Sequence, residues 1–295
     1  MPKSGQSWNR QFLADEPLFR VFESFAKDLR TEDWPSRQDY ARHLELHRAR
    51  SSPQLEPLGV AASPERSRRQ KRTELNLSEL YDGKIALGGQ IYCLDQSYHD
   101  LFNVIIFSAL PRAKRALHTR QFHALQQWLE PEHTRSARLP GRRTREQDAL
   151  TLFDEGGVVL AVSHAERSRL EGCKAATSVA PFEPSTHRVP ILFGHALLEH
   201  LYEGHRALRA SGLFITLPDS AFQSADPAFF CHRIDDLLAE RLENPLEFRT
   251  PKADFIFELA SDGGLSFRAP ELKHPKPATQ RRSPQESDEK PLSRA

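Results

Sequence analysis

Three short blocks of the sequence place ionisable and amide side chains among apolar residues. The first block covers residues 98–103, the second 148–155 and the third 194–200. A buried imidazole or carboxylate costs free energy unless it is paired, so polar residues beside a core are candidates for a site. The candidate catalytic residues are His99, Asn103, Asp148, Asp154, His195 and Glu199.

Two of these blocks contain a pair at helical spacing. His99 and Asn103 are four residues apart, as are His195 and Glu199, so each pair shares one helix face. A His-x-x-x-Glu pair can hold a divalent metal, or the carboxylate can orient the imidazole as a general base. The alternative is a hydrogen-bonded pair that only lines the core. The candidate metal ligands are therefore His99, His195 and Glu199, which we expect to face a common polar pocket.

The acidic residues of the second block have simpler explanations as well. Asp154 and Glu155 precede a Gly-Gly pair between two apolar runs, which predicts a β-hairpin over 149–162. Acidic side chains in such a turn bond to nearby backbone amides. Asp148 follows several arginines, and either pairs with them at the surface or helps them to bind a phosphoester.

The remaining elements follow from apolar periodicity and turn residues. A stripe of apolar side chains predicts an amphipathic helix over 15–30, and the pair Gly88-Gly89 predicts a tight hairpin over 85–94. Ser97 and Asp100 form a capping-box pattern before an apolar run. Further helices are predicted over 98–110, 112–129, 190–202 and 227–242, and further strands over 213–217 and 255–259.

Because helices outweigh short strands and no βαβ alternation occurs, the predicted class is α+β. We expect one mainly helical domain with short β-hairpins, an N-terminal helical appendage and a disordered C-terminal tail. The expected divisions are an appendage at 1–48, a basic linker or loop at 49–74, the main domain at 75–268 and the tail at 269–295.

The charge balance offers no overall attraction to nucleic acid or to a membrane. The chain has 41 Lys and Arg against 40 Asp and Glu. A local basic run stands in the linker and comprises Arg66, Arg68, Arg69, Lys71 and Arg72. The most apolar stretch, 101–110, is about half the length of a membrane span. The three cysteines are far apart and form no Cys-x-x-Cys pair, which favours a reducing cytoplasm.

The three blocks resemble those of an uncharacterised bacterial family, domain of unknown function 3025. That family has a Trp-His-Asp-Phe-Phe-Asn block, an Asp-Ala-Leu-Thr-Leu-Phe-Asp-Glu block and a Gly-His-Ala-Leu block. The second matches residues 148–155 and the third matches 194–197, whereas the first has Tyr98 for Trp and Leu101 for Phe. The resemblance covers about 75–217 and implies no activity, cofactor or fold.

Missing motifs exclude several reactions. The chain has no Gly-x-Ser-x-Gly elbow, no phosphate-binding loop and no dinucleotide fingerprint. A nucleophilic Cys93 beside His99 is less favoured than a buried, inert cysteine. Two hypotheses remain. The first, which asks least of the sequence, is a non-catalytic cytoplasmic binding or accessory protein. The second is a metal-assisted or acid/base hydrolase that uses a His/Asp/Glu cluster, with a phosphoester as one candidate substrate.

Overall fold

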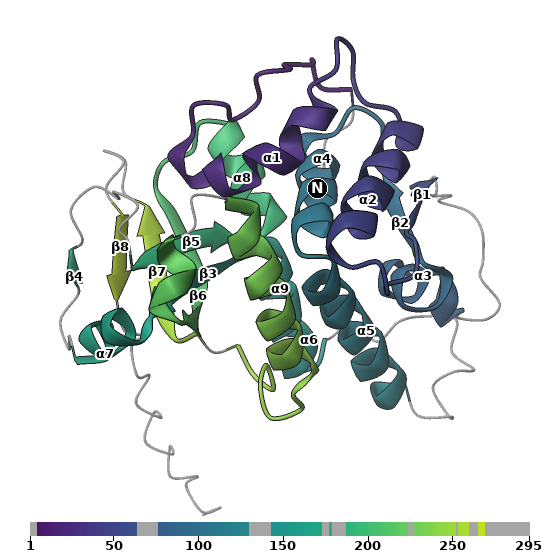
Figure 1. Ribbon diagram of the computed structural model, residues 1–295. Helices are drawn as coiled ribbons and strands as arrows, with labels where there is room; N and C mark the ends of the chain where they lie inside the picture. Colours follow the sequence, from purple (N-terminus) through teal and green to yellow (C-terminus); the bar gives the residue numbers. More distant parts are fainter. Residues whose placement is uncertain are drawn as a thin grey trace, which may run out of the picture.

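The computed structural model has a mixed β-sheet on one side and a group of helices on the other (Figure 1). The structure describes residues 5–63, 76–129, 143–172, 177–178, 187–223, 227–251, 253–259 and 265–268. In this part of the chain the buried apolar side chains form a core that runs from the N-terminal segment to the sheet. The predicted class, a mainly helical α+β domain, is confirmed.

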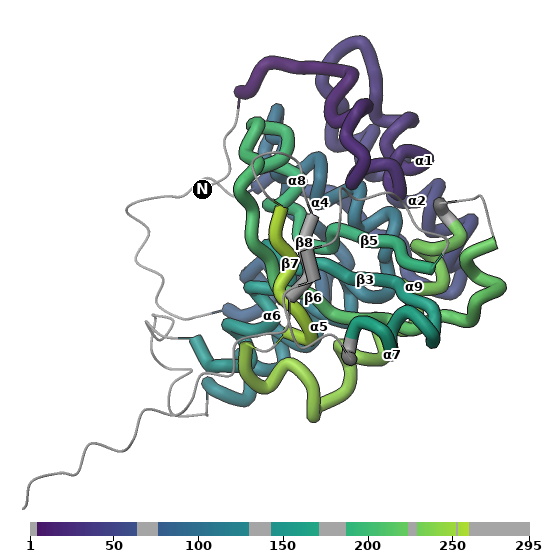
Figure 2. Tube along the Cα trace, turned by 90° about the vertical axis from the view of Figure 1, so that its left-hand side faces the viewer, coloured from purple at the N-terminus to yellow at the C-terminus, as the bar shows by residue number. Residues whose placement is uncertain are grey.

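The main sheet has six strands in the order β4-β8-β7-β6-β3-β5. β3 is parallel to β6 and antiparallel to β5, and each of its residues is buried, as expected of a strand covered on both faces. Figure 2 shows β7, β6, β3 and β5 side by side across the molecule. The strands are β3 Gly157–Ser163, β4 Thr177–Ser178, β5 Arg188–Leu192, β6 Leu208–Leu217, β7 Phe255–Leu259 and β8 Leu265–Arg268.

The helices form layers beside this sheet. α6, α8 and α9 contact the strands, and α4 and α5 contact those helices in turn (Figure 1). Almost every residue of α4 is buried, so this helix is surrounded by other elements. The helices of these layers are α4 Tyr98–Ala109, α5 Pro111–Trp128, α6 Arg145–Gly156, α8 His195–Tyr202 and α9 Pro227–Glu243, with α7 His164–Gly172 after β3.

The N-terminal segment is helical but is not one regular helix. It forms three consecutive short turns, η1 Pro17–Phe22, α1 Glu23–Ala26 and η2 Lys27–Leu29. Its predicted apolar stripe is buried, because η1 packs on β5 and α9 and α1 packs on α4. The longer helix α2, Arg37–Ser51, follows and begins with a Ser36 capping box.

Gly88 and Gly89 end a helix instead of turning a hairpin, so that prediction is wrong. α3, Tyr81–Gly88, stops at Gly89, whose φ of +55° is the left-handed conformation typical of a helix C-terminus. The next residues form β2, Gln90–Cys93, which pairs in parallel with β1, Gly59–Ala62. A strand therefore lies within the predicted linker, and the 3-10 turn η3, Leu77–Glu79, precedes α3.

The predicted hairpin over 149–162 is also wrong, because only its second half is a strand. Thr144 accepts a hydrogen bond from the amide of Gln147, whose side chain accepts one from Thr144, and this capping box starts α6. Conversely, the helix predicted over 190–202 begins only at His195. Pro190 lies in β5, where an edge strand tolerates a residue without an amide hydrogen.

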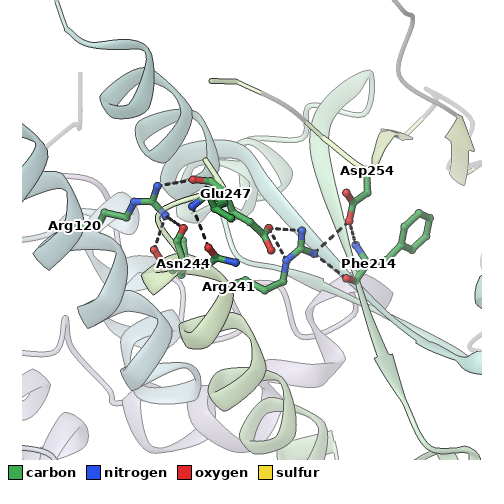
Figure 3. A network of polar contacts seen from close by, with 8 residues as sticks. Arg120, Phe214, Arg241, Asn244, Glu247 and Asp254 are labelled. Carbon is green, nitrogen blue, oxygen red and sulfur yellow. Dashed lines mark hydrogen bonds and ion pairs between the residues drawn. The ribbon is translucent and has the colours of Figure 1, made fainter. Parts of the chain in front are cut away.

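Two arginines hold the chain segment that follows α9. The 3-10 turn η4, Asp219–Gln223, lies before that helix. Arg120 of α5 donates to backbone carbonyls of Leu242, Asn244 and Glu247 (Figure 3). Arg241 binds the Glu247 carboxylate and also donates to the carbonyl of Phe214 in β6. These contacts tie an irregular segment to both the helices and the sheet.

Some predictions concern residues that the structure does not describe. They are the basic run 66–72, the C-terminal tail 269–295, one of the arginines that precede Asp148 in the sequence (Arg142), and one of the three cysteines (Cys173). The proposed division of the chain into an appendage, a linker, a main domain and a tail stays a prediction. In the described ranges, no helix has both the length and the apolar composition needed to cross a bilayer.

Candidate functional site

Two histidines that are 96 positions apart in the chain face each other. His99 is the second residue of α4 and His195 is the first residue of α8, and these helices pack together. Their Nε2 atoms are 2.9 Å apart, and the ring centroids are separated by 4.4 Å. His195 is almost completely buried, whereas the His99 side chain is 16% exposed, so the pair lies just beneath the surface.

The other ring nitrogen of each histidine has a fixed partner. His99 Nδ1 is 2.9 Å from a carboxylate oxygen of Glu199, and His195 Nδ1 is 3.0 Å from the backbone carbonyl of Asp154. A carbonyl or an ionised carboxylate can only accept, so both Nδ1 atoms carry the hydrogen. In the neutral tautomer that results, each Nε2 atom presents a lone pair.

The two Nε2 lone pairs would then point at each other. This arrangement is repulsive unless a proton or a cation lies between the nitrogens. Burial lowers the pKa of His99, but the hydrogen bond to Glu199 and nearby carboxylates outweigh it, so the pKa lies above its usual value. Burial places the pKa of His195 well below its usual value. The space between the two Nε2 atoms can thus hold one proton, which is bound to His99 and shared with His195. Alternatively, a metal ion can take the place of that proton.

Glu155 supplies a third donor atom at the open side of the pair. It is the residue before the last of α6, and its Oε2 atom lies 3.6 Å from His195 Nε2. The side chain is 47% exposed, which gives this side access to solvent. Donor atoms of His99, His195 and Glu155 all lie within 4.8 Å of one another. Two imidazoles and a carboxylate form a donor set that suits zinc and related divalent ions.

Glycine allows the second and third sequence blocks to meet. A Cβ atom at Gly194, the residue before α8, would lie 2.5 Å from the carbonyl oxygen of Glu155 and from the amide of Gly156. The amides of Phe193 and Gly194 both donate to the carbonyl of Gly157 at 2.9 Å. The start of α8 is thereby held against the end of α6, and His195 reaches the Asp154 carbonyl.

A buried ion pair joins the end of α6 to α5. Lys114 of α5 is fully buried, and its Nζ atom is 2.5 Å from an oxygen of Asp154. Burial alone would raise the pKa of Asp154, but Lys114 and then His118 hold it far below its usual value. His118 in turn bonds to Asp82 at 2.9 Å. The carboxylate of Asp154 therefore secures the backbone carbonyl that orients His195.

Several predicted site residues have different partners from those expected. Glu199 orients His99 and not His195. Asn103 does not share a partner with His99, since it donates to Tyr81. Asp154 is not in a hairpin turn, and its side chain binds Lys114. Asp148 is exposed in the first turn of α6, about 9 Å along the helix axis from Asp154.

The first turn of α4 also differs from the predicted capping box. Ser97 accepts from the amide of Asp100, but the backbone amide that donates to the Asp100 carboxylate is that of Leu94 and not that of residue 97. Burial raises the pKa of the Cys93 thiol well above its usual value, which is expected of an inert buried cysteine.

Sequence reasoning assigned Glu155 to a turn and did not single out Lys114. A lysine three residues after a helix-starting proline carries no chemical signature, so its burial could not be read from spacing. Glu155 could have been found only if α6 had been recognised as a helix. The end of that helix, which carries Glu155, packs against Gly194 of the third block. Three hollows within the described ranges, one of about 670 Å³ and lined by Arg112, Arg120 and Arg249, have no lining residue in the histidine group.

The fold and this geometry define an α+β protein with a histidine–carboxylate group where the ends of three helices meet. The three helices carry the three sequence blocks. The model of a protein family of unknown function, DUF3025, matches residues 69–255, and the chain belongs to this family. Comparisons with curated proteins and with solved structures give no significant match.

Proposed function

We propose that this protein is a metal-assisted hydrolase in which His99, His195 and Glu155 hold one divalent cation. The observation that carries the proposal is the 2.9 Å separation of two Nε2 atoms whose Nδ1 hydrogens are already committed. Two nitrogens bound to one tetrahedral metal at about 2.1 Å stand about 3.4 Å apart, so a small separation of the two rings would let a cation replace the repulsion with two bonds.

Such a centre has the parts that metal-assisted hydrolysis requires. Three protein ligands leave a coordination position for water, and a bound divalent metal lowers the pKa of that water toward neutrality. The exposed side of Glu155 gives a substrate access to this position. Glu199 and the Asp154 carbonyl act as positioning groups, because each fixes the tautomer of one ligand.

The substrate class stays open within the hydrolases. The arginines that directly precede Asp148 in the sequence favour a phosphoester, but Asp148 itself is not part of the histidine group. A screen should therefore include carboxylic esters, amides and phosphoesters. We also propose a cytoplasmic location, which the buried cysteine Cys93 supports because it forms no disulfide.

A second candidate function is metal-free acid/base catalysis by the two histidines. It is favoured by the same 2.9 Å distance, which equals that of an ordinary hydrogen bond. Here His99 would carry the shared proton, in keeping with its raised pKa, and His195 would be the neutral partner. The non-catalytic accessory protein predicted first from the sequence requires neither metal nor turnover.

Metal analysis and a hydrolase screen separate these functions. We expect the purified protein to retain zinc, manganese or a similar ion, and His195→Gln and Glu155→Gln to lose metal and turnover together. Glu199→Gln should weaken metal binding by about 10–100-fold, because it removes only a positioning group. His123→Gln is the matched control, since this exposed histidine of α5 belongs to none of the histidine–carboxylate groups in the described part of the chain.

The alternatives give different results. Turnover that survives chelators but is lost in His195→Gln would favour the metal-free pair. A protein that binds no metal at these residues and hydrolyses none of the substrates would leave the accessory role, and the proposal would be rejected.

A further inference from the structure

Another group of metal-ligating side chains lies in the N-terminal segment, outside the residues that the family model matches. His43 and His47 are one turn apart on α2, and Asp28 of η2 faces them. One donor atom from each residue lies within 4.8 Å of the others. His47 Nε2 is 3.6 Å from a carboxylate oxygen of Asp28, and the ring centroids of His43 and His47 are 4.5 Å apart.

Both histidines of this group are buried, and several of their ring nitrogens lack a hydrogen bond. His43 is 4% exposed and His47 is 7% exposed. Both ring nitrogens of His43 and Nε2 of His47 have no hydrogen-bond partner within the described part of the chain. Buried polar atoms in proteins are nearly always paired, because an unpaired one forfeits its interaction with water. Each residue offers one donor atom to the cluster, so one His43 nitrogen and His47 Nε2 are the two unpaired atoms that a species outside the polypeptide would complete.

The chemistry of the donors indicates what that species is. Burial lowers the pKa of both histidines, so the rings are neutral at pH 7 and offer lone pairs. Two histidines at i and i+4 on one helix face can bind the same ion, and a carboxylate completes a donor set that zinc favours. Phe25 packs on His47, with 4.9 Å between ring centroids, and the partly exposed Asp28 leaves an entry path.

We propose that Asp28, His43 and His47 bind one divalent transition-metal ion of the zinc class. Such an ion would join η2 to α2, so its role is to stabilise the N-terminal segment. The site shares no residue with the group at His99 and His195, and therefore does not rest on the function proposed above.

Equilibrium dialysis against Zn²⁺ alone tests the proposal with the full-length, chelator-stripped protein. The parent for this experiment is His195→Gln, which removes the other candidate site. We expect this parent to bind one equivalent of Zn²⁺, and the added change His43→Gln to abolish that equivalent. His123→Gln, which alters an exposed histidine of α5, is the matched control and should retain it. An unchanged Zn²⁺ content after His43→Gln would overturn the proposal.

A milder variant keeps the test decisive if the buried substitutions do not fold. Asp28→Asn changes a partly exposed side chain and should weaken Zn²⁺ binding at least tenfold, whereas Asp33→Asn, an exposed control nearby, should not. Zn²⁺ should also raise the melting temperature of the His195→Gln parent, and Asp28→Asn should reduce that rise. Equal Zn²⁺ affinity in the Asp28 and Asp33 variants would refute the site.

Discussion

Replacing Asp154 by Asn should strongly destabilise the protein, because it leaves a cation in the core. Lys114 has no exposed surface, and its ammonium group donates to the Asp154 carboxylate. Breaking a buried ion pair at one side costs about 3–5 kcal/mol. The cost in stability has an upper limit, because an ordinary lysine of pKa about 10.4 can lose its proton at pH 7 for roughly 4.6 kcal/mol. The faces of Phe107 and Phe193, with Nζ at 4.9 and 5.5 Å from the ring centroids, reduce the loss slightly. We expect a loss of about 3–4 kcal/mol.

A second substitution should reverse much of this loss. Lys114→Met added to Asp154→Asn removes the unpaired cation and retains an apolar stem of similar length. The double variant should therefore be more stable than Asp154→Asn alone by about 2 kcal/mol. This gain is the matched control, because a simple packing defect at residue 154 would not be relieved by a change at residue 114.

Urea denaturation followed by tryptophan fluorescence supplies both the stability and its pH dependence. In Asp154→Asn the unpaired ammonium of Lys114 is penalised in the folded core but not in the unfolded chain, and this penalty falls as the pH rises. The stability of Asp154→Asn relative to the double variant should rise as the pH increases from 7 to 10. A loss below about 1 kcal/mol, or a double variant no more stable than the single one, would refute the argument.

Two further predictions concern helix ends. Gly194→Ala should cost about 3 kcal/mol or more in urea denaturation, since its Cβ would overlap backbone of α6, whereas Gly156→Ala, with open space around its Cβ, should stay within about 1 kcal/mol of the parent. Burial raises the pKa of Asp235 to about 7, although amides of Arg112 and Ala113 donate to it. Protonated Asp235 therefore contributes its full stabilisation below about pH 4, and this is lost as the pH rises through 7, by up to about 4 kcal/mol in the free energy of unfolding. Asp235→Asn should remove this part of the dependence of stability on pH. An unchanged pH dependence in the variant would contradict the prediction.

The sequence predicted the elements whose apolar pattern has one interpretation. α4, α5, α9 and β7 were expected within one or two residues of their observed ends, since the first three carry long helical periodicity. The run around Leu150 was assigned to a strand because a short apolar run fits either structure, and the deciding signal was the capping box at Thr144. Gly89 was assigned to a turn, although a glycine after an apolar run ends helices equally well.

The candidate site shows the same limit. The sequence predicted that His99, His195 and Glu199 would face one pocket, and His99 contacts both His195 and Glu199; the shared pocket and their role in function stay predictions. Spacing within one helix could not show that Glu199 serves the histidine of a different helix. Likewise, the spacing of His43 and His47 could have been noticed, but the burial that leaves their nitrogens unpaired depends on how η2 folds over α2.

The position of the N-terminal segment has a consequence during synthesis on the ribosome. η1 buries Phe19 and Phe22, yet one of its packing partners, α9, begins about 200 residues later in the chain. At roughly 5–20 residues per second, these phenylalanines await their final contacts for about 10–40 s. A segment that leaves the ribosome long before α9 is thus among the last to be covered, and it is where a chaperone that binds exposed aromatic side chains would act.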